Sequence, residues 1–332
     1  MKKRLSHFLI FTLGALLSIN ACTKKPDTIA PSDNSFSNYF ANQRSTTQTF
    51  NFNANTSNTL YGLKGTRVNI GAGTLRTISG QRVTGNVTLE LKEVTKLSEM
   101  NVNNAPTVSN GKILTSGGEF YISASQNGSP LKLADNASFF ISVVAPKGTT
   151  DSMNVFTGRD SSGTVIWKSV QADTVNSRVI IPADSSQKRW DTSVYYQNLG
   201  WAIINKTNEY VVKCTQFGWI NCDYFSTYTD VCRLTATCDT IYKTTYTKVF
   251  YTIPATNTVG NFYINTNLEF FCNTIPNNYK LNIAAINYHD GKYYVALTQH
   301  TMNCSLTPNS AKLDFIEIQE SQIESYLSQI NI

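Results

Sequence analysis

Apolar and polar residues alternate with a period of two along the first part of the chain. Val87, Leu89 and Leu91 alternate with polar residues, and the same pattern recurs over residues 120–124 and 139–143. This period predicts strands with one face in a core and the other in solvent. Turn-forming pairs separate the predicted strands, at Ser79-Gly80, Asn110-Gly111, Gly117-Gly118 and Asn127-Gly128. We therefore predict a mainly β fold, with an antiparallel β-sandwich-like domain over residues 46–200.

Strand patterns continue towards the C-terminus. Further short apolar runs lie at residues 153–156, 165–167, 210–213, 247–251, 279–285 and 293–297. The sequence His289-Asp290-Gly291 separates the last two runs and predicts a hairpin turn. Ser321 and Glu324 have capping-box spacing, and the apolar residues around them share one helical face, which predicts a short C-terminal helix. We expect a second antiparallel β domain over residues 201–332, after a boundary between about residues 185 and 208.

The first residues combine positive charge with a short apolar run. Three basic residues at positions 2–4 precede an apolar segment at residues 8–17, and Ala21 precedes Cys22. Such a segment suits a signal peptide and is too short for the ~20 residues of a spanning helix. The pattern predicts a lipoprotein signal peptide over residues 1–21, with cleavage before Cys22 and lipidation of its thiol. An ordinary secreted protein, with Cys22 merely the first mature residue, is the alternative.

Residues 22–45 predict a flexible tether. They are polar, contain Pro26 and Pro31 and show no hydrophobic period. This composition favours an extended linker over a packed element. Two or three acyl chains on Cys22 would hold the protein stably at a membrane, so we expect membrane lipid as one partner.

Charged residues are scarce and carry little net charge. Asp, Glu, Lys and Arg make up 15% of the 332 residues, and the formal net charge is +6. Removal of residues 1–21 would leave 25 basic and 22 acidic residues, a net charge of +3. Because no basic run remains, we expect no nucleic-acid partner.

Six cysteines follow Cys22 in the chain, and all of them lie in its C-terminal part: Cys214, Cys222, Cys232, Cys238, Cys272 and Cys304. An even number of cysteines in an exported chain predicts disulfides, although the sequence does not choose among the possible pairings. Buried free thiols are the alternative for some of them. The chain lacks a Cys-x-x-Cys pair and keeps only His289 and His300 beyond the predicted signal, so we expect no metal site.

Several stretches resemble a known group of proteins. Arg67–Ile70, Ser79–Leu91 and Leu114–Tyr121 resemble uncharacterised lipoproteins of Bacteroidetes bacteria, whose front domain is similar to the ZU-five sandwich of netrin receptors and ankyrins. The segment Gly218–Phe225 looks like the Gly-Trp-Ile-Asn-Cys-Asp-Arg-Phe signature of the same group, with Tyr224 at the arginine position. The resemblance implies a lineage and a ZU-five-like β domain over residues 46–200, but no activity.

Side chains suited to catalysis are few. A nucleophile activated by histidine would need His289 or His300, and His289 lies in the predicted turn. Glycoside hydrolysis needs two carboxylates that flank the bond, whereas Glu90 and Glu93 lie on a predicted strand in an outward, solvated position. We therefore expect no catalytic residue, no enzymatic activity and no cofactor.

The segment Gly218–Phe225 is the first candidate for a ligand site. Trp219 is expected to pack, while Asn221 and Asp223 carry oxygen atoms that suit a cation such as Ca²⁺. A structural corner of the domain is the interpretation that we favour for these three residues. The tyrosines are the second candidate, because 14 of 17 lie from Tyr195 onward and such rings suit a sugar- or protein-binding face.

These patterns together favour a non-enzymatic lipoprotein with a binding, adhesion or envelope-assembly role. A carbohydrate-binding module of a glycan-uptake system and an enzyme with an unfamiliar site are the alternatives. Because Thr23 follows Cys22 where some inner-membrane lipoproteins have Asp, we expect a lipid anchor in the outer membrane, with the body facing either the periplasm or the cell surface. A protein or glycan of the envelope is the expected partner.

Overall fold

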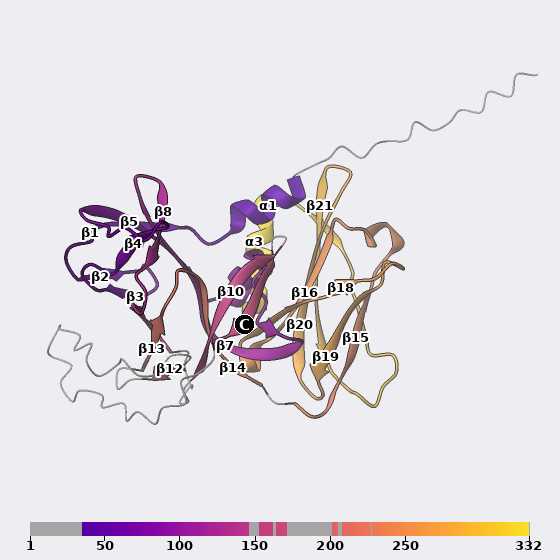
Figure 1. Ribbon diagram of the computed structural model, residues 1–332. Helices are drawn as coiled ribbons and strands as arrows, with labels where there is room; N and C mark the ends of the chain where they lie inside the picture. The colour runs from indigo at the N-terminus through magenta and orange to yellow at the C-terminus, as the bar shows by residue number, and fades with distance from the viewer. Residues whose placement is uncertain are drawn as a thin grey trace, which may run out of the picture. The chain divides into compact units, whose positions relative to one another are not determined.

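The structure is a computed structural model that describes residues 35–145, 153–161, 164–170, 201–204, 208–226 and 228–331 (Figure 1). The predicted signal peptide, Cys22 and the tether up to residue 34 lie outside the described residues. Antiparallel strands dominate the described chain and a short helix lies near its C-terminal end, which confirms the predicted mainly β fold. No helix among these residues is long and apolar enough to cross a membrane.

The described strands of the first β region form one large sheet. Their bounds are β1 Gln48–Asn53, β2 Asn58–Tyr61, β3 Arg67–Ile70, β4 Leu75–Thr77, β5 Asn86–Val94, β6 Val108–Ser109, β7 Lys112–Gln126, β8 Ser129–Leu133, β9 Phe139–Val144, β10 Met153–Ser161, β11 Thr164–Ser169, β12 Trp201–Ile204, β13 Glu209–Cys214 and β14 Gly218–Phe225. Most follow in the order β1-β5-β7-β14-β10-β12-β13-β9-β3-β2, with β4, β6, β8 and β11 paired alongside. Leu89 in β5 and Ile141 in β9 stand far apart in this order but share one apolar core. The sheet therefore folds over that core in the manner of a sandwich.

Residues 201–225 belong to this first sheet. Strand β14 pairs with β7 and β10, while β13 pairs with β9. The first sheet therefore extends to residue 225, past the division expected at residue 201. The pattern of apolar residues in this segment predicts which side chains are buried, but it does not predict which strand supplies the hydrogen-bond partners.

The second β region contains two further sheets. The first has the order β18-β19-β15-β22 and the second has the order β17-β16-β20-β21-β23. Their bounds are β15 Val231–Thr237, β16 Thr247–Ile253, β17 Thr258–Asn261, β18 Tyr263–Ile264, β19 Phe270–Pro276, β20 Lys280–His289, β21 Lys292–Thr301, β22 Ser310–Lys312 and β23 Ile316–Ile318. Leu234 and Phe270 of one sheet share a core with Ile283 of the other. Asp290 and Gly291 join β20 to β21 with φ of 49° and 77°, which confirms the predicted hairpin turn.

Helix α1 (Ser35–Gln43) lies in the segment predicted to be a tether, and it corrects that prediction for these residues. Phe36, Tyr39 and Phe40 are spaced so that they share one helical face. Tyr39 packs with a ring distance of 5.6 Å on Tyr293 of β21. Figure 1 shows α1 beside β21 and α3, and the three elements share one apolar cluster. The aromatic face, rather than the polar composition around it, decides the structure here.

The remaining helices are short. Helix α3 (Ile323–Leu327) is the predicted C-terminal helix, and its two end residues are buried as expected. The 3₁₀ turn η4 (Glu320–Gln322) precedes it, and Gln319 with Gln322 forms the capping box in place of Ser321 and Glu324. The pattern did not predict α2 (Leu97–Val102). The other 3₁₀ turns are η2 Thr240–Tyr242, η3 Pro254–Thr256 and η5 Ser328–Asn331.

Candidate functional site

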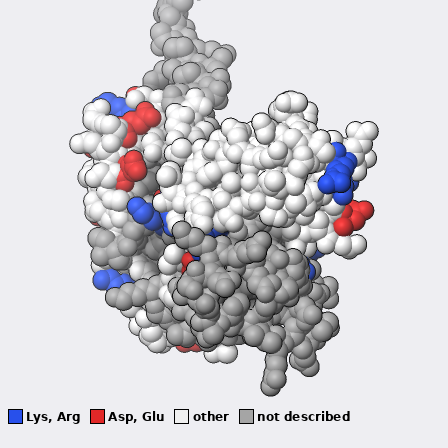
Figure 2. All heavy atoms as spheres, turned by 90° about the vertical axis from the view of Figure 1, so that its left-hand side faces the viewer, with Lys and Arg blue, Asp and Glu red and all other residues white. Residues whose placement is uncertain are grey.

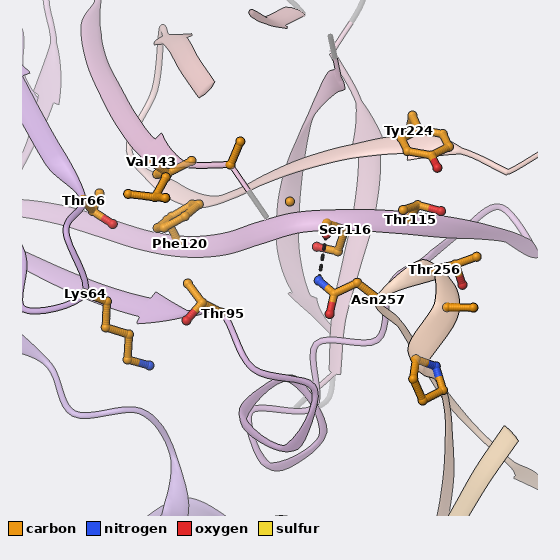
Figure 3. Close-up of a pocket in the computed structure, with 15 residues that line it drawn as sticks. Lys64, Thr66, Thr95, Thr115, Ser116, Phe120, Val143, Tyr224, Thr256 and Asn257 are labelled. Atoms are coloured by element: carbon orange, nitrogen blue, oxygen red, sulfur yellow. Dashed lines mark hydrogen bonds between the residues drawn. The ribbon is translucent and has the colours of Figure 1, made fainter. Parts of the chain in front are cut away.

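A pocket of about 600 Å³ lies beside the middle of strand β7 (Figure 3). Its polar lining residues are Lys64, Thr66, Thr95, Thr115, Ser116, Tyr224, Thr256 and Asn257. In Figure 3, Thr115, Thr256 and Tyr224 lie on one side of Ser116, whereas the threonines at 66 and 95 lie on the other with Lys64. Among the described residues, the lining therefore offers several hydroxyl groups and one amide, with a single charged side chain.

Asn257 links two parts of the pocket lining by a hydrogen bond. It follows η3 with a φ of 47°, a conformation that asparagine adopts more readily than most residues. Its Nδ2 donates a hydrogen bond of 2.7 Å to the main-chain oxygen of Ser116. The neighbouring Thr258 Oγ1 donates to the main-chain oxygen of Leu114 at 2.8 Å. These bonds hold η3 against β7, so the pocket combines residues of both β regions.

The charge of Lys64 is compensated within the wall. Its Nζ pairs with the Glu99 carboxylate and donates to the main-chain oxygen of Glu93 at 2.9 Å. On the face in Figure 2, the described basic and acidic side chains are few and interspersed rather than gathered in one patch. The described lining of the pocket thus presents a nearly neutral polar surface to a ligand.

Glu93 is hydrogen-bonded to Lys64 and is buried, which corrects the expected solvated position of Glu93. Its carboxylate accepts hydrogen bonds from Gln48 Nε2 at 2.7 Å and from the main-chain nitrogens of Lys64 and Thr66 at 2.9 and 3.1 Å. Burial raises the pKa of Glu93, but the hydrogen bonds outweigh burial and hold that pKa below its usual value. Glu90 keeps the expected exposed position and accepts a hydrogen bond from Ser123.

Two carboxyl groups are buried where β7 and β14 pair. Glu119 lies opposite Asn221 and Ser116 lies opposite Asp223, with an irregular register between the two pairs. All four residues are essentially inaccessible to solvent. Asn221 Nδ2 donates to Asp223 Oδ2 at 2.6 Å. Burial raises the pKa of both carboxyl groups well above the usual values, and the nearby charge of Asp223 raises that of Glu119 further.

The predicted ligand segment is therefore partly assembled. Asn221 and Asp223 do lie together, whereas Trp219 packs against Tyr121 and Trp167 at ring distances of 5.4 and 6.2 Å. Sequence reasoning missed Glu119. Its signal is an acidic residue inside an otherwise buried strand, directly after Gly117-Gly118.

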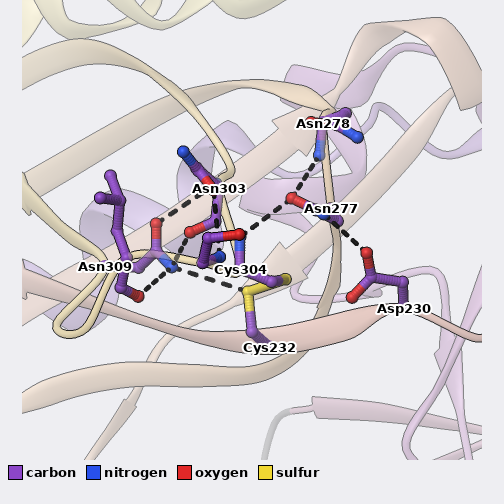
Figure 4. The surroundings of a disulfide bond; sticks show 9 residues. Asp230, Cys232, Asn277, Asn278, Asn303, Cys304 and Asn309 are labelled. Atoms are coloured by element: carbon purple, nitrogen blue, oxygen red, sulfur yellow. Dashed lines mark hydrogen bonds between the residues drawn. A yellow bond between two sulfur atoms is a disulfide. The ribbon is translucent and has the colours of Figure 1, made fainter.

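One cysteine pair forms a disulfide. Cys232 and Cys304 are bonded, with Cα atoms 5.6 Å apart (Figure 4). The other four candidates, Cys214, Cys222, Cys238 and Cys272, are free thiols, which corrects their predicted pairing. Cys214 and Cys222 lie on β13 and β14, which are not neighbours in the sheet. Cys272 pairs across the sheet with Leu234, which precedes Cys238 by four residues.

The histidines stand apart from these groups. His289 lies at the β20–β21 turn beside Asp290, at 3.3 Å, and His300 lies in β21 opposite Leu281. Within the described ranges, no group of three or more His, Cys, Asp or Glu side chains is placed to hold a metal ion.

Most of the described tyrosines of the C-terminal part pack against other rings. Tyr228 packs on Tyr279, and Tyr242 packs on Phe315 at 4.3 Å. Tyr224 is exposed and, among the described tyrosines of this group, it is the one that lines the pocket.

Comparison with known protein-family models finds no match for the chain, and a search of curated proteins also finds none.

Proposed function

We propose that the protein is a non-enzymatic, lipid-anchored binding protein of the bacterial outer membrane, and that its pocket takes a neutral, hydroxyl-rich ligand such as a short glycan segment. The observation that carries this proposal is the described lining of the pocket, which is rich in hydroxyl groups and whose one charged side chain, Lys64, is paired with Glu99. A volume of about 600 Å³ lies within the usual range for pockets that bind small molecules.

The chemistry of the lining favours a sugar over an anion or an apolar ligand. Threonine and serine hydroxyls both donate and accept hydrogen bonds, as sugar hydroxyls require. The ring of Tyr224 is partly exposed at the pocket and can pack against the apolar face of a sugar. Lys64 is engaged with Glu99, so it adds little attraction for an anion.

Replacing Tyr224 by Ala is expected to weaken glycan binding about tenfold, since the packing of one ring is lost. A glycan array identifies the ligand, and isothermal titration calorimetry of the full chain then measures the dissociation constant for the wild type and the variant. Tyr263→Ala is the matched control, because Tyr263 is exposed and lies outside the pocket. An array without binding, or equal affinities for Tyr224→Ala and the wild type, would contradict the proposal.

Replacing Cys22 by Ser is expected to release the protein from the membrane fraction, because the predicted acyl chains are attached to the Cys22 thiol and the amino group that cleavage exposes. Cell fractionation measures the distribution, and mass spectrometry of the mature N-terminus measures the lipid directly. Cys238→Ser serves as the control, since this free cysteine has no predicted role in anchoring. An unmodified Cys22 in the wild type would refute the anchor.

A further inference from the structure

The carboxyl groups between β7 and β14 gather on one face of the sheet because of an extra residue in β7. Asn221 and Asp223 are two residues apart along β14. Their cross-strand partners, Glu119 and Ser116, are three residues apart along β7. Cross-strand partners point to the same side of a sheet, so all four side chains lie on one face. Without the extra residue, Ser116 and Glu119 would point to opposite faces.

Two glycines make this irregularity possible. A Cβ atom on Gly117 would stand 2.9 Å from the main-chain oxygen of Cys222 and 2.7 Å from Met153 Sδ. Gly118 has a φ of 128°, which side-chain-bearing residues rarely adopt. The backbone thus accepts tight packing and an unusual conformation at the place where the polar side chains converge.

Three of the four carboxylate oxygens at this place have no hydrogen-bond partner among the described residues. Among the described residues, both oxygens of Glu119 and the Oδ1 of Asp223 accept no hydrogen bond. Asn221 contacts Asp223 at 2.6 Å, and Ser116 Oγ lies 3.4 Å from Asn221 Oδ1. A buried, unpaired carboxylate costs several kcal/mol unless a cation or a proton compensates it.

We propose that Glu119 and Asp223, together with the oxygens of Asn221 and Ser116, bind a hard divalent cation of the Ca²⁺ class within the large sheet. Carboxylate, amide and hydroxyl oxygens are the ligands that such ions take in proteins. The Cys222 side chain lies in the core on the other face of β14, so within the described part of the chain the site offers no sulfur or imidazole to Zn²⁺. Only two of the ligands are carboxylates, and the neutral oxygens complete the set.

The cation would cross-link β7 to β14 at the irregular register. Ser116 and Gly117 also line the pocket, so the ion would stiffen that wall. The cation site rests on the buried carboxylates alone and stands whether or not the pocket takes a glycan.

The test compares the cation dependence of the wild type and of isosteric variants. The full chain is stripped with a chelator and its thermal unfolding is followed with no cation, with Ca²⁺ or with Mg²⁺. Saturating Ca²⁺ is expected to raise the Tm of the wild type by about 5 °C or more. Glu119→Gln and Asp223→Asn are each expected to abolish this shift, while Glu90→Gln, which changes an exposed carboxylate in the neighbouring β5, retains it.

Direct measurement of bound metal keeps the proposal falsifiable if a variant does not fold. Elemental analysis of the wild type after dialysis against Ca²⁺ is expected to show one ion per chain. Absence of bound metal, together with a Tm that does not respond to either cation, would overturn the proposal. If no metal binds and the Glu119→Gln variant is more stable than the stripped wild type, a proton rather than a cation neutralises the buried carboxylate.

Discussion

Removing the Cys232–Cys304 disulfide is expected to lower the free energy of unfolding by about 4 kcal/mol, a larger loss than we expect from any other substitution in this protein. The two cysteines are separated by 72 residues, and the loop they close contains β15 to β21. A cross-link over so long a loop restricts the unfolded chain, and the loss of that restriction favours unfolding. Urea unfolding of the double variant Cys232→Ala/Cys304→Ala, compared with the oxidised wild type, measures the difference.

The surroundings of the disulfide add a local contribution (Figure 4). The main-chain nitrogen of Cys304 donates to Asn277 Oδ1 at 2.9 Å, and Asn277 Nδ2 donates to Asp230 at 2.6 Å. Asn309 Nδ2 donates to the main-chain oxygen of Asn303 at 2.7 Å. These bonds hold the loop that carries Cys304 and the residues next to β15, which carries Cys232. Cys238→Ser is the control, with an expected change below about 1 kcal/mol, and an equal loss in the control would contradict the assignment.

Replacing Glu93 by Ala is expected to lower the free energy of unfolding by about 3 kcal/mol at neutral pH. The substitution leaves Gln48 and the main-chain nitrogens of Lys64 and Thr66 without their acceptor. Those nitrogens belong to the turn between β2 and β3, so the turn should loosen as well. Chemical unfolding measures the difference, and Glu90→Ala on the same strand is the matched control because that carboxylate is exposed.

The effect of Glu93 should also depend on pH. The pKa of Glu93 is held below its usual value in the folded protein, so the folded state takes up its proton at lower pH than the unfolded state does. The carboxylate therefore stabilises the fold above the unfolded pKa of about 4.3 and loses this contribution as the pH falls through the folded pKa. The stability difference between the wild type and Glu93→Ala should shrink below about pH 4. A difference that stays constant from neutral pH down through this range would contradict the account.

The sequence predicted the local structure well where one period dominates. The alternation at residues 87–91 and 139–143 became β5 and β9, and the turn at Asp290-Gly291 was placed correctly. Each of these depends on neighbouring residues only: a period of two defines a buried face, and a pair such as Asp-Gly adopts the positive φ that a tight hairpin needs.

The candidate sites were predicted only in part. Asn221 and Asp223 stood out because they lie in the signature-like segment Gly218–Phe225 and carry oxygen atoms that suit a cation. Glu119 lies far earlier in the chain and joins them only through the pairing of β7 with β14. The polar pocket likewise depends on the hydrogen bond from Asn257 to Ser116, which no local pattern predicts.

The sequence by itself determined the mainly β class, the strands with a clear period and the short C-terminal helix. The tertiary structure alone decided that residues 201–225 complete the first sheet, that Cys232 pairs with Cys304 and that α1 packs on β21. It also decided that Glu119 and Asp223 share one face of the sheet. The physical reason is that a strand pattern specifies the buried face through local geometry, whereas partners and register follow from contacts between distant segments, whose free energy depends on the whole fold.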